Sequence, residues 1–227
     1  MIIFRNVTKI FPPHTVALDR VSFEIEFGEL VALVGRSGAG KTTILKLLTK
    51  EIEPTYGEIW YKNLNLNHLS KKKIPILRKK ITTIFQDFKL LLNKTVFQNV
   101  ALPLEIAGWD KKRINDRVNY ILEILNLMKY KDKLTKVLSG GEKQKVAIAR
   151  ALSLDPEVIL CDEPTGNLDP ITTKEILDVI LEAKSDNKII IIATHNPEVV
   201  SYLKPRVITL DYGRIVRDEY PGKFILT

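Results

Sequence analysis

The stretch Gly35-Arg36-Ser37-Gly38-Ala39-Gly40-Lys41-Thr42 decides how this chain is expected to fold. Its spacing is G-x-x-x-x-G-K-[ST], in which the glycines let successive backbone N–H groups point at phosphate oxygens. An apolar run at 29–34 precedes the stretch, and an apolar stripe at helical spacing follows it, formed by Ile44, Leu45, Leu47 and Leu48. The pattern predicts a buried strand, a phosphate-binding turn and a helix whose N-terminus faces the phosphate.

The two residues that end this loop have separate expected roles. Lys41 is expected to reach the β- and γ-phosphates of a nucleotide, and Thr42 to ligate Mg²⁺. A glycine-rich turn can also be a plain connection between a strand and a helix. Here both flanking elements that phosphate binding requires are present, which favours the functional interpretation.

A pair of carboxylates follows another apolar run. Residues 158–161 form a short continuous apolar stretch, typical of a strand buried on both faces, and Asp162 and Glu163 come directly after it. Ligands of parallel sheets bind at the carboxyl edge of the strands. Alone, the pair could be only a strand terminus. Together with the phosphate loop, it predicts that Asp162 holds the metal and that Glu163 orients or deprotonates the attacking water.

A third feature is Leu138-Ser139-Gly140-Gly141-Glu142, which opens a helix that should stop before Asp155. A serine hydroxyl and exposed N–H groups at a helix N-terminus can bind an anion, although such a string in isolation could be a simple N-cap. One nucleotide does not need two such sites in one chain. We therefore expect the second site to serve the γ-phosphate held by a neighbouring subunit.

Further elements are expected from hydrophobic periodicity. Strands are predicted at 2–7, at 57–61, at 81–85 and at 189–193, and period-two alternation at Val21, Phe23, Ile25 and Phe27 predicts another. An amphipathic helix is predicted from Ile114 to Met128 and another at 173–184, with a terminal hairpin at 206–219 turning at Asp211-Tyr212-Gly213. Strand, helix, strand with this apolar density favours a parallel sheet wrapped by helices.

The phosphate loop, the Ser-Gly-Gly segment and the Asp-Glu pair stand in the order and spacing of ATP-binding cassette (ABC) nucleotide-binding domains, which the whole chain resembles. The resemblance implies an α/β fold with a mixed sheet core, an N-terminal antiparallel β subdomain and a helical insertion. It implies one domain over 1–227, with an ATP-binding core at 1–87 and 155–227 and a helical subdomain at about 88–154. It also implies an ATPase that uses ATP and Mg²⁺ and forms a head-to-tail homodimer.

The resemblance also assigns individual residues. Gln86 would sense Mg²⁺ and face a membrane partner, Asn167-Leu168-Asp169 would link the two sites of the dimer, and His195 would contact the γ-phosphate. Phe11 would stack on adenine, although a phenylalanine in this strand-rich segment could equally belong to the core. The expected catalytic residues are Glu163, His195, Lys41 and Gln86, and the expected metal ligands are Thr42, Gln86 and Asp162. The expected nucleotide-binding residues are Phe11, Gly35, Arg36, Ser37, Gly38, Ala39, Gly40, Lys41, Thr42, Thr43, Ser139, Gly140, Gly141 and Asp169.

Within the family the chain resembles the cell-division branch, whose ATPase pairs with an integral membrane subunit. Two segments carry this resemblance, IPILRK at 74–79 and FQDFKLL at 85–91, and NKTVFQNV at 93–100 and segment 163–169 add support. It implies that ATP-driven conformational change is transmitted across the membrane to regulate peptidoglycan hydrolysis. Segment 163–169 is shared with lipoprotein-release and macrolide-export ATPases, which stay the alternative.

One departure from the family pattern follows Glu142, which ends the Ser-Gly-Gly segment that serves as the family's signature. Relatives usually carry Gln-Gln-Arg there, whereas this chain has Lys143-Gln144-Lys145. Lysine lacks the planar fork of arginine, so a contact made at position 145 is expected to differ. The signature serine, its glycines and the carboxylate pair are intact, and turnover is expected to survive.

Composition limits the other possibilities. The 45% apolar and 27% charged residues are typical of a folded protein, and no run approaches the roughly 20 apolar residues that span a bilayer. We therefore expect a peripheral protein at the cytoplasmic face of the membrane, with a separate membrane subunit. The single cysteine, Cys161, excludes an intramolecular disulfide and fits a reducing compartment.

The net charge of +8 suggests an acidic partner, since stretch 62–80 contains seven Lys or Arg and no Asp or Glu. A solvated basic surface is favoured over a membrane-proximal one. A DNA-clamping relative would carry long coiled coils between Lys41 and Ser139, and no sustained heptads occur there, so no nucleic-acid partner is expected. A scaffold that binds ATP and barely hydrolyses it stays open.

Overall fold

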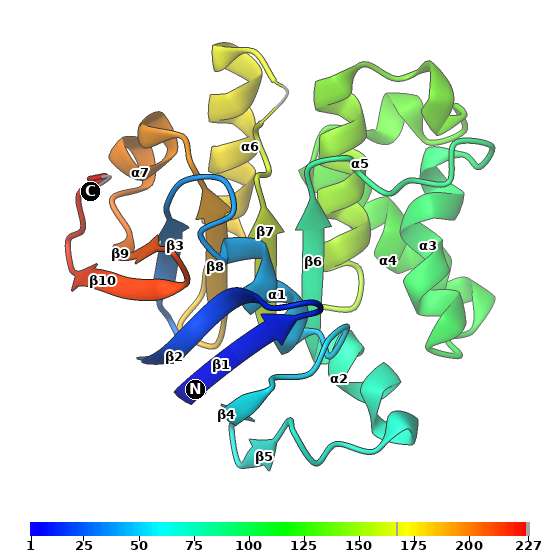
Figure 1. Ribbon diagram of the computed structural model, residues 1–227. Helices are drawn as coiled ribbons and strands as arrows, with labels where there is room; N and C mark the ends of the chain where they lie inside the picture. Colours follow the sequence, from blue (N-terminus) through cyan, green and yellow to red (C-terminus); the bar gives the residue numbers. More distant parts are fainter. Residues whose placement is uncertain (167, 226–227) are drawn as a thin grey trace. The chain divides into compact units, whose positions relative to one another are not determined.

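The computed structural model describes residues 1–166 and 168–225 (Figure 1). Its strands are β1 (Ile2–Phe11), β2 (Thr15–Ile25), β3 (Leu30–Val34), β4 (Tyr56–Tyr61), β5 (Leu64–Asn65), β6 (Ile81–Phe85), β7 (Val158–Asp162), β8 (Ile189–Thr194), β9 (Arg206–Asp211) and β10 (Arg214–Glu219). Its α-helices are α1 (Lys41–Leu48), α2 (Ile74–Lys80), α3 (Val96–Ile106), α4 (Lys111–Ile124), α5 (Gly140–Leu152), α6 (Pro170–Glu182) and α7 (Pro197–Leu203).

The chain divides into two compact units. The first, called the core unit here, comprises 1–83, 157–163 and 184–227, and the second, the helical unit, comprises 84–156 and 164–183. The helical unit therefore includes α6 as well as the middle of the chain. The narrower helical subdomain at about 88–154, inferred from resemblance, stays a prediction.

An antiparallel sheet in the order β2-β1-β4-β5 forms one layer of the core unit. Val21, Phe23 and Ile25 on β2 are buried and the residues between them are exposed, which confirms the period-two pattern. The Phe23 ring stacks on the Phe4 ring of β1 with centroids 4.5 Å apart. The N-terminal antiparallel subdomain expected from the sequence is thus present.

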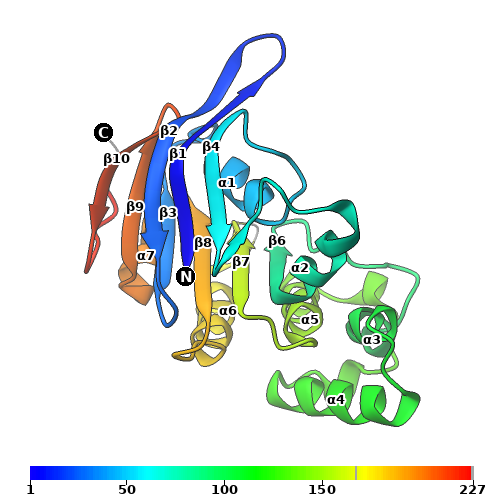
Figure 2. The same ribbon diagram turned by 90° about the horizontal axis from the view of Figure 1, so that it is seen from below.

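The second sheet has the order β10-β9-β3-β8-β7-β6. β3 pairs with β8 and β9, and β7 pairs with β8, all in parallel, while β10 closes one edge by antiparallel pairing with β9. Strands β3 and β8 are buried at every residue. One face packs with α1 and the antiparallel sheet in a common core, and the other packs against α7 (Figure 2). Continuous burial on both faces explains why these strands read as unbroken apolar runs.

The helical unit has its own apolar core, built mainly from α3, α4 and α5. Thr95 and Ser139 begin α3 and α5 with capping boxes, in which the third helical residue reaches back to the cap N–H. The expected helix to Met128 is wrong at its end, since α4 stops at Ile124 and Met128 lies in a 3₁₀ turn. Asn126 adopts φ 55° and the Leu127 N–H donates to the Leu122 carbonyl, which terminates the helix.

Two other helices, α6 and α7, differ from what the sequence predicts. Helix α6 begins at Pro170 and not at Thr173, because Asp169 accepts hydrogen bonds from the N–H groups of Ile171 and Thr172. Helix α7 was not predicted, and Asn196 caps it in the same way. In the described part of the chain, no helix combines the length and apolarity needed to cross a bilayer.

A cluster of hydrogen bonds ties the start of β7 to the rest of the core unit. Glu157 accepts from Lys62 at 2.5 Å, from Lys80 at 2.8 Å and from the Tyr61 hydroxyl. Burial by itself would raise the pKa of Glu157, but the hydrogen bonds from Lys62, Lys80 and Tyr61 outweigh it and lower the pKa to about 2.

We predict that Glu157→Gln destabilises the protein at pH 6 and that the difference from the parent shrinks as pH falls. The folded-state pKa is depressed, so the contribution is present above the unfolded value of 4.5 and is lost as pH falls toward about 2. Urea unfolding at pH 6, 4.5 and 3 measures it, with the exposed Glu24→Gln as control. A destabilisation that is the same at all three pH values would contradict the prediction.

Candidate functional site

The glycine-rich loop between β3 and α1 is shaped by its packing as well as by its sequence. Gly40 is the N-cap of α1, with φ 106°, and no side chain caps the helix N-terminus. A Cβ on Gly40 would lie 2.6 Å from the Ala17 carbonyl oxygen of β2. Only glycine combines this conformation with this approach, and the first N–H groups of α1 are left to bind an anion.

Lys41 is the first residue of α1 and its side chain lies across the loop. Its Nζ donates to the carbonyl of Gly35 at 2.7 Å and to that of Arg36 at 3.2 Å. Burial lowers the pKa of Lys41, while the nearby carboxylates of Glu163 and Asp162 act to raise it. A buried ammonium group is therefore held at the loop, beside two carboxylates.

Thr42, Asp162 and Glu163 come together as the sequence predicts. The Thr42 hydroxyl donates to Asp162 Oδ1 at 3.0 Å, which links α1 to the end of β7. Burial raises the pKa of Asp162, the Thr42 hydrogen bond opposes that effect, and the adjacent Glu163 adds to it. The sequence separation of the partners is 120 residues.

His195 follows β8 and contacts the second carboxylate. Its Nδ1 lies 2.7 Å from Glu163 Oε1, and its backbone N–H donates to Oε2 at 3.4 Å. Glu163 itself adopts φ 49°, and its own N–H donates to the Ala193 carbonyl of β8. Non-glycine residues rarely occupy this region, so the backbone is strained at the residue expected to act on water.

In the helical unit, the N-termini of α5 and α6 lie against each other. Ser139 caps α5, where its hydroxyl accepts from the Glu142 N–H at 3.3 Å and its N–H donates to Glu142 Oε2 at 2.8 Å. A Cβ on Gly141 would lie 2.4 Å from a methyl carbon of Thr172, so the first turns of the two helices are in close contact. Asp169 accepts from the Thr172 hydroxyl as well as capping α6.

Gln86, also in the helical unit, packs beside the segment that follows the carboxylate pair. A Cβ on Gly166 would lie 2.8 Å from Gln86 Nε2, so the glutamine side chain lies close against this glycine. Gln144 of α5 is fully buried and donates to the Pro164 carbonyl at 2.8 Å. Segment 164–166 is therefore held between Gln86 and α5.

The remaining predicted residues are less closely grouped. Phe11 ends β1, is partly exposed, and has the Lys9 ammonium group 4.9 Å from its ring centroid. Asn167, named in the predicted linking loop, lies outside the described residues. The core unit thus groups Lys41, Thr42, Asp162, Glu163 and His195, and the helical unit groups Gln86, Ser139, Gly140, Gly141 and Asp169.

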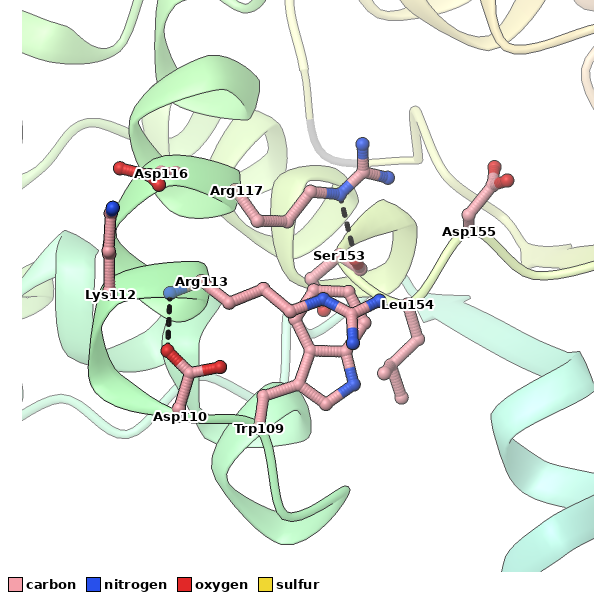
Figure 3. Close-up of a pocket in the computed structure, with 9 residues that line it drawn as sticks. All are labelled: Trp109, Asp110, Lys112, Arg113, Asp116, Arg117, Ser153, Leu154 and Asp155. Atoms are coloured by element: carbon pink, nitrogen blue, oxygen red, sulfur yellow. Dashed lines mark hydrogen bonds between the residues drawn. The ribbon is translucent and has the colours of Figure 1, made fainter.

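A hollow of about 680 Å³ in the helical unit contains none of these residues. Figure 3 shows that Arg113 of α4 lies over the Trp109 ring and that Arg117 points toward Ser153. The Arg113 Cζ atom is 3.6 Å from the centroid of the Trp109 ring. Acidic and basic side chains line the hollow together: Asp110, Lys112, Arg113, Asp116, Arg117 and Asp155. Charges of both signs leave no net preference for an anion or a cation.

Comparisons with known proteins show the family of the chain. A family model described as ABC transporter matches residues 18–166. The cell division ATP-binding protein FtsE of Bacillus subtilis is 44% identical over 227 residues, covering 99% of this chain and 98% of the relative. The methionine import ATP-binding protein MetN of Carboxydothermus hydrogenoformans is 42% identical over 221 residues, covering 96% of this chain and 66% of the relative.

A solved structure extends the likeness to three dimensions. The dimeric post-hydrolysis state of the ATP-binding cassette MJ0796, bound to ADP and Pi, has a TM-score of 0.88 at 33% identity and covers 99% of this chain and 100% of its own. The chain is an ATP-binding cassette ATPase. It binds and hydrolyses ATP as the ATPase subunit of a transporter-like complex.

Sequence reasoning missed one group in this ABC ATPase. Arg150 lies on α5 next to the buried residues Ala147, Ala149 and Ala151, and donates to two backbone carbonyls. The signal in the sequence was a basic residue close to the apolar stripe of a predicted helix. Lys145, the departure from the family pattern, forms an ion pair with Glu175 of α6 at 2.7 Å.

We predict that Gly40→Ala is much more destabilising than Gly38→Ala. Both glycines have positive φ, so alanine costs about 1–2 kcal/mol at either position. Only at Gly40 does the new Cβ also collide with backbone, because the space around Gly38 is open to 4 Å. Thermal unfolding without nucleotide measures the difference, and equal losses at the two positions would refute the packing argument.

Proposed function

We propose that this ABC ATPase drives a membrane complex of the FtsE–FtsX kind, which transmits ATP-driven conformational change across the membrane to regulate peptidoglycan hydrolysis in cell division. The observation that carries the proposal is the 44% identity to an FtsE protein over nearly all of both chains. Segments 74–79 and 85–91, on which the resemblance to the cell-division branch rests, support it.

The proposed nucleotide site uses the core unit. Backbone N–H groups of Gly35–Thr43 and the N-terminus of α1 bind the phosphates, with the Lys41 ammonium group on the β- and γ-phosphates. The carbonyls that now accept from Lys41 Nζ are those of the loop itself, so a short movement exchanges them for phosphate oxygens. Phe11 stacks on the adenine ring at the edge of the site.

The residues present fit a magnesium ion. Mg²⁺ prefers hard oxygen ligands, and the Thr42 hydroxyl and Asp162 carboxylate already lie 3.0 Å apart at the loop. We infer that these two residues hold the ion; Gln86, which belongs to the helical unit, is proposed as a further ligand on the family resemblance alone. When bound, it neutralises charge on the β- and γ-phosphates.

Glu163 and His195 act on the attacking water and on the transferred phosphoryl group. Glu163 accepts the proton of water or orients it for in-line attack, with its carboxylate held by the contact to His195. His195, through its ring, contacts the γ-phosphate. The 2.7 Å contact fixes both side chains before the reaction, which reduces the reorganisation needed in the transition state.

A second copy of the chain completes each site in this proposal. Ser139, Gly140 and Gly141 at the start of α5 bind the γ-phosphate held by the other protomer, and Asp169 links the two sites. The capping box holds the Ser139 hydroxyl at the first turn of α5, beside exposed N–H groups. The dimeric structure of the ATP-binding cassette MJ0796 bound to ADP and Pi supports this arrangement.

The membrane partner is an integral FtsX-like subunit. We infer that its cytoplasmic helices contact the loop after Gln86 and that this ATPase lies peripherally at the cytoplasmic face of the membrane. Closure of the homodimer on ATP pushes on these helices and hydrolysis releases them. No nucleic acid takes part.

We predict that Glu163→Gln lowers ATP turnover by about 100-fold or more and retains MgATP binding, because the proton acceptor is lost while the phosphate loop is intact. The variant should accumulate as an ATP-bound dimer. Steady-state ATPase assays and size-exclusion chromatography with MgATP measure both effects.

The matched control for this variant is Glu105→Gln, which removes an exposed carboxylate from α3 and should change neither property. The role assigned to Glu163 fails if the variant hydrolyses ATP as fast as the parent or stays monomeric with MgATP. A scaffold that barely hydrolyses ATP would show the same slow rate in parent and variant.

The second candidate function is methionine import, which the 42% identity to MetN favours. Detergent co-purification with Glu163→Gln as bait separates the candidates. We predict recovery of a small membrane protein with a large external loop. Recovery of a methionine permease would support import. Recovery of a lipoprotein-handling pair, or of a subunit with a large periplasmic domain, would support an exporter. Each of these outcomes would contradict the assignment to cell division.

A further inference from the structure

The loop after Gln86 has an unusual backbone. Phe88 and Lys89 are consecutive non-glycine residues with φ 61° and 49°, both in the left-handed region. A non-glycine residue is strained in this region, and the conformation persists only where its surroundings hold it. Neighbouring groups must therefore hold Phe88 and Lys89 in this conformation.

Arg150 of α5 supplies the main restraint. Its guanidinium donates to the Lys89 carbonyl at 2.6 Å and to the Phe88 carbonyl at 2.9 Å, the two residues with left-handed φ. Burial lowers the pKa of the Arg150 guanidinium. A desolvated charge is costly unless hydrogen-bonded, so these two carbonyls are what satisfies it.

A second side chain holds the far end of the same loop. Asn99 of α3 is fully buried, accepts from the Leu91 N–H at 2.8 Å and donates to the carbonyls of Leu91 and Thr95. The loop is thus tied to α5 at 88–89 and to α3 at 91–95. Gln86 stands directly before the first tie, with its side chain against Gly166.

We propose that Arg150 is a positioning residue for ATP hydrolysis: its fork on Phe88 and Lys89 sets the backbone from which Gln86 projects. The inference rests on the role proposed for Gln86 at the metal. Helix α5 (Gly140–Leu152) is capped by Ser139 and carries Arg150 in its last turn, so one rigid element joins this serine to the loop after Gln86, called the glutamine loop here.

The test is a double-mutant cycle on the MgATPase activity of the full chain, with Arg150→Gln, Gln86→Ala and the combined variant. We expect Arg150→Gln, which removes the charged two-donor contact to Phe88 and Lys89, to lower kcat about tenfold, with the KM for ATP changed less than about twofold. In the Gln86→Ala background the same substitution should change kcat by less than about twofold. Arg150→Lys, which keeps the charge, should recover part of the loss.

Arg117→Gln is the matched control. Arg117 is half-buried like Arg150 and donates to two backbone carbonyls of the same unit, those of Leu152 and Ser153 (Figure 3). Both of these hydrogen bonds lie outside the glutamine loop, so the loss of Arg117 should lower thermal stability and leave kcat unchanged. The apparent Mg²⁺ constant is a further readout, which should weaken in Arg150→Gln and not in Arg117→Gln.

Three results would overturn the inference. Additive effects of Arg150→Gln and Gln86→Ala would mean that the arginine acts independently of the glutamine. Equal loss of kcat in Arg117→Gln would reduce Arg150 to a stability role. A kinetically silent Gln86→Ala would remove the role of Gln86 and the inference with it. The assay needs no membrane partner, so a failed division assignment leaves its outcome intact.

Discussion

The register between β3, β8 and β7 sets where the chemical groups of the core unit lie. Val34 opposes Thr194 across the first pair of strands, and Ala193 opposes Asp162 across the second. The chain therefore leaves all three strands at one level of the sheet, where it carries the glycine loop, His195 and Glu163. Parallel strands end at the same edge, and a slip of one residue would turn every side chain of a strand to the opposite face.

Close backbone packing adds two local features at this edge of the sheet. Gly40 touches β2, and Glu163 holds a left-handed conformation through its hydrogen bond to Ala193. Both features need the antiparallel and parallel sheets to share one core with α1. The strain at Glu163 is maintained by its neighbours, which is typical of residues that act on substrate.

In the helical unit, α5 has a similar organising position. Ser139 caps this helix of 13 residues, which carries Gln144, bonded to the Pro164 carbonyl, Lys145, paired with Glu175, and Arg150, bonded to the glutamine loop. Gln144 Oε1 is buried and without a hydrogen-bond partner in the described structure. An acceptor that is buried and left unpaired costs free energy.

The sequence by itself determined the phosphate loop, the buried strands and the carboxylate pair, because each depends on residue types at short spacing. The same local logic predicted the hairpin turn at Asp211-Tyr212-Gly213 and the Ser139 helix start. Phe11 and Gln86 were reached only through resemblance, since a single aromatic or amide side chain carries no local pattern. The ends of α4 and α6 were misjudged because Asn126 and Asp169 terminate or begin helices through hydrogen bonds that periodicity does not record.

Only the tertiary structure decided which groups meet. Thr42 and Asp162 are 120 residues apart, and their contact follows from the sheet order, not from either neighbourhood in the sequence. The two hydrogen bonds of the Arg150 guanidinium are harder to predict than the contact of Thr42 with Asp162, because they are made to backbone carbonyls, which every residue has. Because the partner residue can be of any type, its identity gives no signal in the sequence. Only the folded structure therefore shows which carbonyls such a side chain binds.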